Sequence, residues 1–187
     1  MKKSVSLIYL LGSVILIVLL FSSPLSAEEK FRTRYVTLGG PIREKAITIN
    51  ITVNDYTTPE EVTLMKRLLR EKGSMAFVDE FRKFDKGVIN FKSARGLNMR
   101  INAAHSYDTD TGRRIVVFTE RQAWDTESEI RITGTFMFMA IVLELDERGG
   151  GKGKFYPGVN IKLDDDGYVI IDTFQSPKLL MGARQTK

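Results

Sequence analysis

The chain has 187 residues, no cysteine, one histidine and one tryptophan, and a formal net charge of +5 at pH 7. A hydrophobic content of 43% with 27% charged residues excludes a disordered or fibrous protein. The lack of cysteine excludes a disulfide scaffold, a thiolate metal site and a cysteine nucleophile. Two of the cations lie in the first three residues, so the remaining positive excess is too weak to predict a nucleic-acid partner.

Residues 1–27 have the pattern of a Sec signal peptide. Lys2 and Lys3 form a positive start, Leu7–Phe21 is apolar, and Ser22–Ala27 is small and turn-forming. We therefore expect an exported protein, periplasmic or secreted, with no membrane span once the signal is cleaved. The alternative is a retained membrane anchor, because Val5–Phe21 is at the short limit for spanning a bilayer.

The rest of the chain divides into an arm and one domain. Residues 28–45 are polar and basic, and we expect a loose N-terminal arm with a short strand at 33–38. Residues 46–187 are long enough for a single domain with its own core. Within this domain, Ile47–Val53 alternates apolar and polar residues, which predicts a half-buried strand.

A pair of helices should follow this strand. Thr58 is suited to cap the first helix, Pro59 to occupy its first position, and Glu61 to complete a capping box. Gly73 is suited to end that helix, and a second short helix is expected at 74–84. The spacing of their apolar residues favours packing on a sheet over a groove for a ligand or partner.

After residue 85 the sequence predicts strands joined by hairpin turns. Both faces of 136–145 are apolar, so the core of the sheet should cover one face and the helices the other. The fold class is therefore α+β, with a curled or barrel-like antiparallel β-sheet of about seven strands and an inserted pair of helices. The strands are expected at 87–92, 97–106, 113–121, 130–146, 153–163, 168–174 and 179–183, with Asp- and Gly-rich turns at 108–112, 147–151 and 164–167.

Two sequence motifs resemble ligand-binding loops and fail in detail. Asp164–Gly167 would place Lys162 and Thr173 at the first and last positions of a calcium loop, where carboxylates are needed. Gly149–Lys154 is followed by Phe155, whereas a phosphate loop needs Ser or Thr there. We predict hairpin turns at both places, and no cofactor or metal.

Two places have side chains suited to chemistry or binding. His105 is the only imidazole and is expected on the apolar face of its strand, where Asp108 and Asp110 could pair with it as a general base; a structural role is favoured. Arg121 and Trp124 are the candidate ligand-binding residues, because one offers a bidentate donor and the other a stacking face. The alternative is that Trp124 closes the end of the sheet.

Several segments carry a resemblance. They are Ile47–Leu69, Gly112–Arg121 leading to Trp124, Ile141–Asp146, and Val159–Leu163 with its Asp/Gly turn. Through them the chain resembles a group of small exported bacterial proteins of unassigned function. The resemblance implies export and a single domain, and it carries no catalytic residue, cofactor or ligand.

The expected function is a non-enzymatic binding or accessory domain, whose partner is an envelope protein or a small ligand. An apolar cavity between sheet and helices would favour a small apolar ligand. The alternative is an envelope-acting hydrolase that uses carboxylates with His105. That alternative requires a carboxylate within hydrogen-bond reach of the imidazole, directly or through one water.

Overall fold

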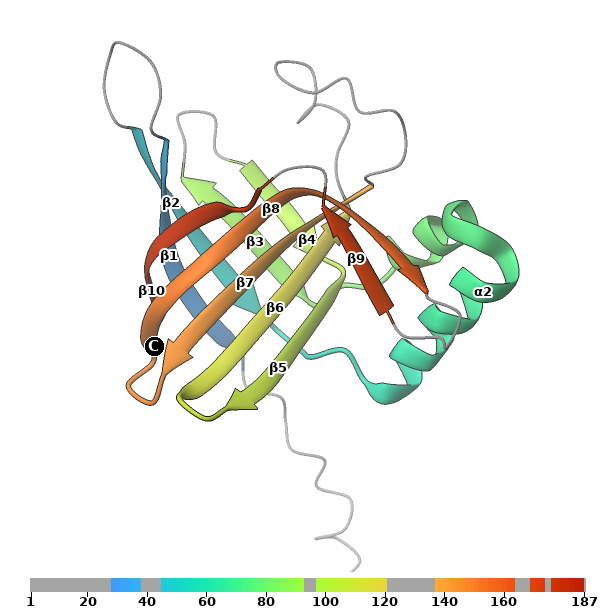
Figure 1. Cartoon of the computed structure of the whole chain (residues 1–187), viewed down its shortest axis with the longest axis horizontal. Helices are drawn as coiled ribbons and strands as arrows, with labels where there is room; N and C mark the ends of the chain where they lie inside the picture. Colours follow the sequence, from blue (N-terminus) through green and yellow to red (C-terminus); the bar gives the residue numbers. More distant parts are fainter. Residues whose placement is uncertain are drawn as a thin grey trace, which may run out of the picture.

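The computed structural model describes residues 28–37, 45–92, 97–120, 137–163, 169–173 and 176–186. This part of the chain is mostly β, with ten strands in one antiparallel sheet and two short helices inserted after the second strand (Figure 1). The label α2 covers both helices. The elements are β1 (Glu29–Thr37), β2 (Lys45–Val53), α2 (Pro59–Phe81), β3 (Gly87–Lys92), β4 (Leu97–Ile101), β5 (Ala103–Thr109), β6 (Gly112–Glu120), β7 (Phe138–Asp146), β8 (Gly150–Leu163), β9 (Val169–Thr173) and β10 (Lys178–Thr186).

The strand order is β4-β3-β2-β1-β10-β8-β7-β6-β5, with β9 paired to β8. The sheet has ten strands rather than about seven, and its ends do not pair, so the expected curled or barrel-like closure is wrong. The end strands β4 and β5 are separated along the chain by Asn102 alone. Because they follow one another end to end, they cannot pair side by side.

β1 lies in the middle of the sheet, between β2 and β10. The sequence predicts a loose arm here, with only a short strand at 33–38. The structure instead has a nine-residue strand, because its alternate residues Phe31 and Thr33 are buried while Arg32 and Arg34 are exposed. The Thr33 hydroxyl also donates a hydrogen bond to the Met181 carbonyl at 3.2 Å. The outward row of cations gives this strand the composition of a basic arm.

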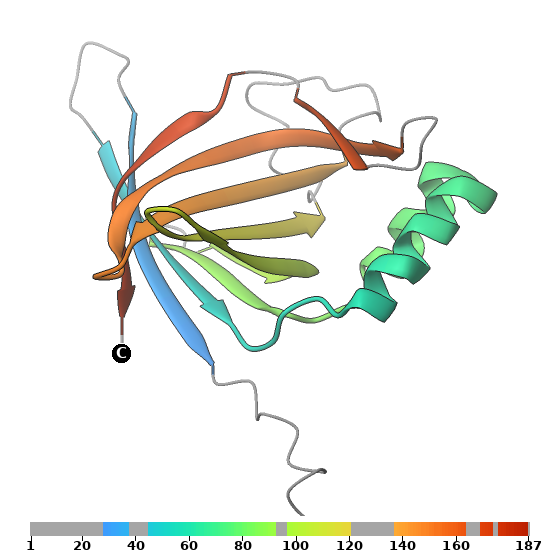
Figure 2. The same cartoon turned by 60° about the horizontal axis from the view of Figure 1, so that its bottom comes forward.

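The helix pair forms as the sequence predicts. Thr58 accepts a hydrogen bond from the Glu61 amide, and the Glu61 carboxylate accepts one from the Thr58 amide at 2.8 Å, so the capping box is confirmed. Gly73 has φ 73°, in the left-handed region, and it separates the two helices. Figure 2 shows α2 standing to one side of the strands.

Two cores hold the protein together, and β7 belongs to both. On β7, Ile141 and Leu143 point into the sheet core, and Phe138 points toward the helices. Both faces are therefore covered in the first half of β7, whereas Val142 and Glu144 further along are only partly buried. The sheet core comprises Phe31, Ile49, Ile51, Val53, Ile89, Met99, Ile101, Ala104, Ile115, Val117, Met139, Ile141, Leu143, Leu145, Leu180 and Ala183, and the helix core comprises Phe77, Val78, Phe81, Ala103, Phe138, Ala140, Val159 and Ile161.

Asn102 interrupts the segment that the sequence predicts as one strand at 97–106. Ala103 after it belongs to the helix core, and Ala104 to the sheet core, so the alternation of faces shifts at this residue. Asn102 is 3% exposed, and its amide N–H donates to the Phe118 carbonyl at 2.9 Å. Its side-chain oxygen accepts from the Glu120 amide at 3.0 Å. These bonds satisfy polar groups that the break would otherwise leave unpaired.

Candidate functional site

The residues that the sequence selects for ligand binding, Arg121 and Trp124, lie outside the described residues. The Asp164–Gly167 turn does so as well, although the strands on either side of it, β8 and β9, pair antiparallel as a hairpin requires. In the described ranges no helix has the length and apolar character to cross a bilayer. The described residues offer other candidates, which are a histidine, a small cavity and three surface hollows.

His105 is not where the sequence predicts it. It was expected on the same face as Met99 and Ile101, but the shift at Asn102 turns it toward the helix side. Burial lowers the pKa of His105 below its ordinary value, and the negative charge of Glu61 opposes this. Its ring stacks on Tyr107 with centroids 6.0 Å apart.

The described residues do not form a catalytic group around His105. Among the described side chains, the charge that shifts the pKa of His105 comes from Glu61, which acts through space without a hydrogen bond. Among the described residues, no three His, Asp or Glu side chains gather closely enough to hold a metal ion. This geometry favours a structural role for the imidazole.

A small cavity lies between the helices and the sheet. Its volume is about 80 Å³, and its lining includes Met65, Leu69, Phe77 and Phe118. Pockets that hold drug-sized ligands measure roughly 300–1,000 Å³. This cavity is therefore too small for such a ligand.

The outer face of β10 has an unusual combination of residues. Leu179 is 69% exposed and Met181 is 62% exposed, while Leu180 between them is buried in the sheet core. Across the strand ladders, Leu179 pairs with Lys154 on β8, and Met181 pairs with Arg34 on β1. Both cations are exposed. Each exposed apolar side chain therefore lies beside a positive charge on a neighbouring strand.

A bulge at Gly182 brings a further cation of β10 to the same outer face. Gly182 has φ 59°, a backbone conformation that favours glycine, and the ladders on both sides of β10 shift register around it. After the bulge, Ala183 returns to the sheet core, and Arg184 lies opposite Arg32 of β1. The extra residue in β10 therefore places Arg184 on the face that presents Met181, next to Arg32.

Two adjoining hollows cover this face. A mostly apolar hollow of about 360 Å³ is lined by Val142, Leu179 and Met181, and its lining also includes Glu144 and two lysines. A basic hollow of about 530 Å³ contains three arginines and shares Met181 and Gly182 with the first hollow. We call the outward side chains of this region the β10 patch; they are Arg32, Arg34, Lys154, Leu179, Met181 and Arg184.

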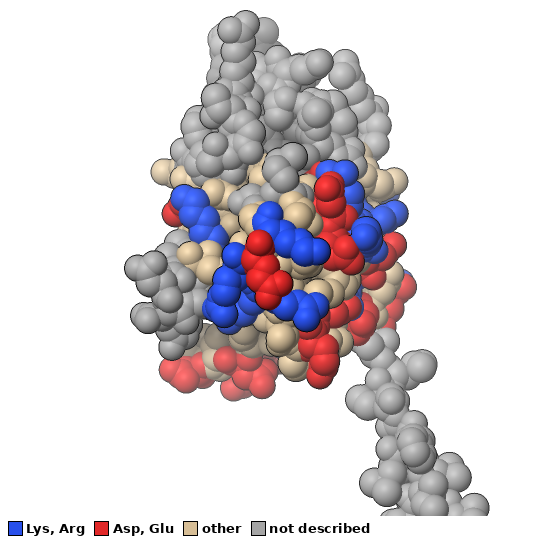
Figure 3. Space-filling view, turned by 90° about the vertical axis from the view of Figure 1, so that its right-hand side faces the viewer, with Lys and Arg blue, Asp and Glu red and all other residues tan. Residues whose placement is uncertain are grey.

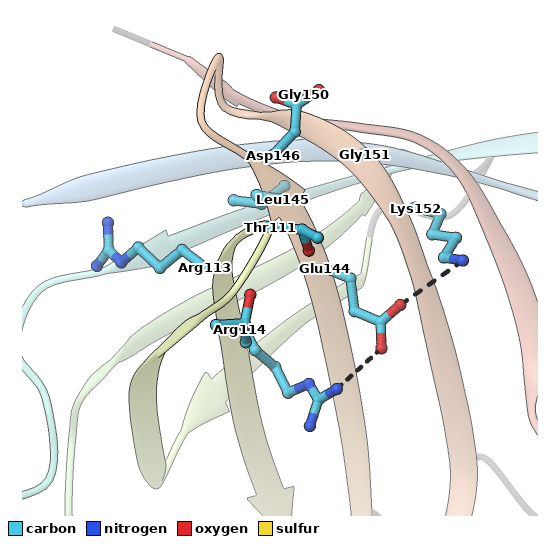
Figure 4. A pocket seen from close by; sticks show the side chains of 10 residues that line it. Thr111, Arg113, Arg114, Glu144, Leu145, Asp146, Gly150, Gly151 and Lys152 are labelled. Atoms are coloured by element: carbon cyan, nitrogen blue, oxygen red, sulfur yellow. Dashed lines mark hydrogen bonds and ion pairs between the residues drawn. The ribbon is translucent and has the colours of Figure 1, made fainter.

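A third hollow, of about 460 Å³, lies beside the first two, at the end of β6, β7 and β8. Figure 4 shows Arg114 and Lys152 reaching toward Glu144 from the two neighbouring strands, whereas Arg113 points away. The distances to the Glu144 carboxylate are 3.2 Å from Arg114 and 3.9 Å from Lys152. The carboxylate is thus neutralised by its own neighbours.

The cations of the β10 patch differ from those around Glu144. Within the described part of the chain, no ion pair involves Arg32, Arg34, Lys154 or Arg184. Their positive charges are therefore available to an anion from outside the described chain. In the patch, exposed apolar side chains lie beside cations that form no ion pair within the described residues.

The surface on the helix side offers a comparison. Figure 3 shows that lysine, arginine and acidic side chains are mixed there. Neighbouring charges at the end of α2 pair with each other, as Lys83 just past the helix does with Glu80 at 2.7 Å. A mixed surface of this kind produces no strong field of one sign, and we take it as an ordinary solvated face.

A polar network joins the start of β1 to β5 and β6. Arg113 donates to the Glu29 carboxylate at 2.9 Å, to the Tyr56 hydroxyl at 3.0 Å and to the Ser106 hydroxyl at 2.7 Å. Burial, together with the charge of Glu29, raises the pKa of Tyr56 to about 12. Each group in the network is satisfied by another protein group, so we assign it to structure.

Comparisons with protein-family models, with curated proteins and with solved structures find no match to this chain. The case for a role therefore depends on the geometry of the β10 patch. The sequence contains one signal for it, the run Leu179–Met181. In a strand, three consecutive apolar residues must place at least one on each face.

Proposed function

We propose that this chain is an exported, non-enzymatic binding domain, and that it binds its ligand or partner in the cell envelope through the β10 patch. The observation that carries the proposal is the placement of Leu179 and Met181, both well exposed, directly beside unneutralised cations. Single exposed apolar residues are normal on protein surfaces, whereas a patch with a charged rim marks interaction sites.

The hydrolase alternative has less support. It requires His105 to act with carboxylates, and the described carboxylates form no hydrogen bond to it. His105 also lines the small cavity beside apolar residues such as Phe118. No observation on the described residues favours a hydrolytic reaction over binding.

Export is supported by the position of the first strand. β1 begins at Glu29, so cleavage after Ala27 removes the signal and leaves the strand whole. The test is mass spectrometry of the protein recovered from its native envelope. We expect a chain that begins at Glu28, and a chain that retains Met1 contradicts cleavage.

The binding role is tested by capture from the native envelope with the processed protein as bait. The wild type is compared with the double variant Leu179→Ser/Met181→Ser. The matched control is Ile171→Ser, because Ile171 is 43% exposed on β9 and lies outside the patch. Thermal melts are needed to check that all three proteins are folded.

We expect the wild type and the Ile171→Ser control to capture the same envelope components. The double variant should lose most of them, because the patch no longer presents apolar side chains. An unchanged set of captured components in the double variant contradicts the proposal.

A further inference from the structure

We propose that the β10 patch docks the protein onto an anionic lipid bilayer. In this arrangement, Leu179 and Met181 enter the membrane interface, and the arginines and Lys154 contact lipid phosphates. The inference rests on the proposed function and specifies what the patch binds.

The first argument is the exposure of the apolar part. Leu179 and Met181 are two residues apart on one strand, so their side chains lie on the same face of the sheet. Both are mostly exposed, and with Val142 they line the apolar hollow on this face. The interface of a bilayer accepts exposed apolar side chains of this kind.

The second argument is the charge around them. Arg34 and Lys154 lie directly opposite the apolar side chains, and Arg184 lies opposite Arg32 beyond the bulge. Glu144, an acidic residue that lines the apolar hollow, already pairs with Arg114 and Lys152. Clusters of Lys and Arg are attracted to the negative surface potential of anionic lipids. Since both components occur on one face, apolar insertion and charge attraction act together.

The third argument concerns a second copy of this chain as the occupant. Two patches facing each other would bring the arginines of one copy against those of the other. Like charges opposed at an interface are strongly unfavourable. The patch is therefore suited to a negatively charged surface.

The first experiment is vesicle co-sedimentation with the processed protein, after mass spectrometry confirms that it begins at Glu28. One vesicle population is phosphatidylcholine alone, and the other contains about one third phosphatidylglycerol, an anionic lipid. We expect binding to the anionic vesicles and at least about a tenfold weaker partition onto the neutral ones. Added salt should weaken the binding, because it screens the attraction.

Two variants separate the contribution of the positive charges to vesicle binding from that of the apolar side chains. Arg34→Gln/Arg184→Gln should lose the preference for anionic vesicles, and Leu179→Ser/Met181→Ser should reduce binding to them about tenfold or more. The control Lys83→Gln changes a cation on the helix side and should bind like the wild type. Equal partition onto both vesicle types, or wild-type binding by both patch variants, overturns the inference.

The second experiment reports insertion directly. The chain has no cysteine, so Met181→Cys can be labelled with an environment-sensitive fluorophore at a single position. We expect its emission to shift to shorter wavelength on anionic vesicles, and the same label at Ile171→Cys to stay unchanged. A shift at position 171 alone, or at neither position, overturns the inference.

The two proposals fail in different ways. If capture from the envelope depends on the patch but no vesicle is bound, the occupant is a protein, and the lipid inference is overturned while the binding function stands. If neither capture nor vesicle binding depends on the patch, both proposals are wrong.

Discussion

The Lys86 ammonium lies 2.8 Å from the Glu61 carboxylate, and the same carboxylate accepts the Thr58 amide in the capping box of α2. The Lys86 side chain is only 7% exposed, and its second partner is Asp55 at 3.1 Å. Burial alone would lower the pKa of Lys86, but the hydrogen bonds to Glu61 and Asp55 outweigh it and raise the pKa. The buried Lys86 ammonium therefore links the start of the helices to the segment just before β3.

We expect Lys86→Met to lower the free energy of unfolding by about 1–3 kcal/mol at pH 7. Methionine fills similar space but leaves the Glu61 carboxylate without its cation. Urea unfolding measures the change. The matched control is Lys83→Met, because its ion pair with Glu80 is exposed and its removal should cost within about 0.5 kcal/mol. Equal stability of the two variants would show that the buried pair contributes nothing.

The phenol of Tyr56 should ionise late. Its hydroxyl donates to Glu29 at 3.2 Å, and burial with that negative charge raises its pKa to about 12. In the unfolded chain a tyrosine ionises near pH 10, so the stability that Tyr56 contributes is complete below pH 10 and is lost as the pH rises to about 12. The measurement is phenolate absorbance in wild type minus Tyr56→Phe. A difference signal with its midpoint near pH 10 would contradict the hydrogen-bonded burial of the Tyr56 hydroxyl.

His105 should titrate below the ordinary histidine range. Burial lowers its pKa from 6.5, with Glu61 opposing. Because the folded state binds the proton less readily, the contribution of the neutral imidazole is present above pH 6.5 and is lost as the pH falls through the lowered pKa. Proton NMR measures this without assignment, since the chain has one histidine. The variant His105→Gln should make the free energy of unfolding less dependent on pH in this range. A titration midpoint of His105 above pH 6.5 would contradict the burial of its imidazole.

The two cores should respond differently to truncation. Phe138 is fully buried, and its ring centroid lies 5.6 Å from Phe77 and 5.1 Å from Phe81. We expect Phe138→Ala to cost about 3–5 kcal/mol and Leu143→Ala, in the sheet core, about 2–5 kcal/mol. Hydrogen exchange distinguishes them, because Phe138→Ala should expose the helix amides first. Uniform loss of protection in both variants would show that helices and sheet unfold as one unit.

The sequence predicts the elements whose signals are local. The capping box depends on Thr58 and Glu61, three residues apart, and the break between the helices depends on Gly73 alone. The two covered faces in the first half of β7 follow from its run of apolar residues. These features need no knowledge of which strands become neighbours.

Features that depend on distant partners were missed. β1 has the composition of a basic arm, and only its pairing with β2 and β10 buries Phe31 and Thr33. The change of face at Asn102 depends on bonds to Phe118 and Glu120, which the spacing of residues does not reveal. The β10 patch was missed for the same reason, since its cations come from β1 and β8. The patch can be located only when the order of the strands in the sheet is known.

The pairing of β1 with β10 makes completion of the sheet depend on the last segment of the chain. Lys30 pairs with Thr186, so the first and last described strands lie side by side near the centre of the strand order. Contacts this distant along the chain slow folding, because the intervening segment must be ordered before they form. While the chain is being synthesised, the edge of β1 that pairs with β10 stays unpaired until β10 has emerged. Such an exposed edge is prone to aggregation, and protection by a chaperone would be most useful during this interval.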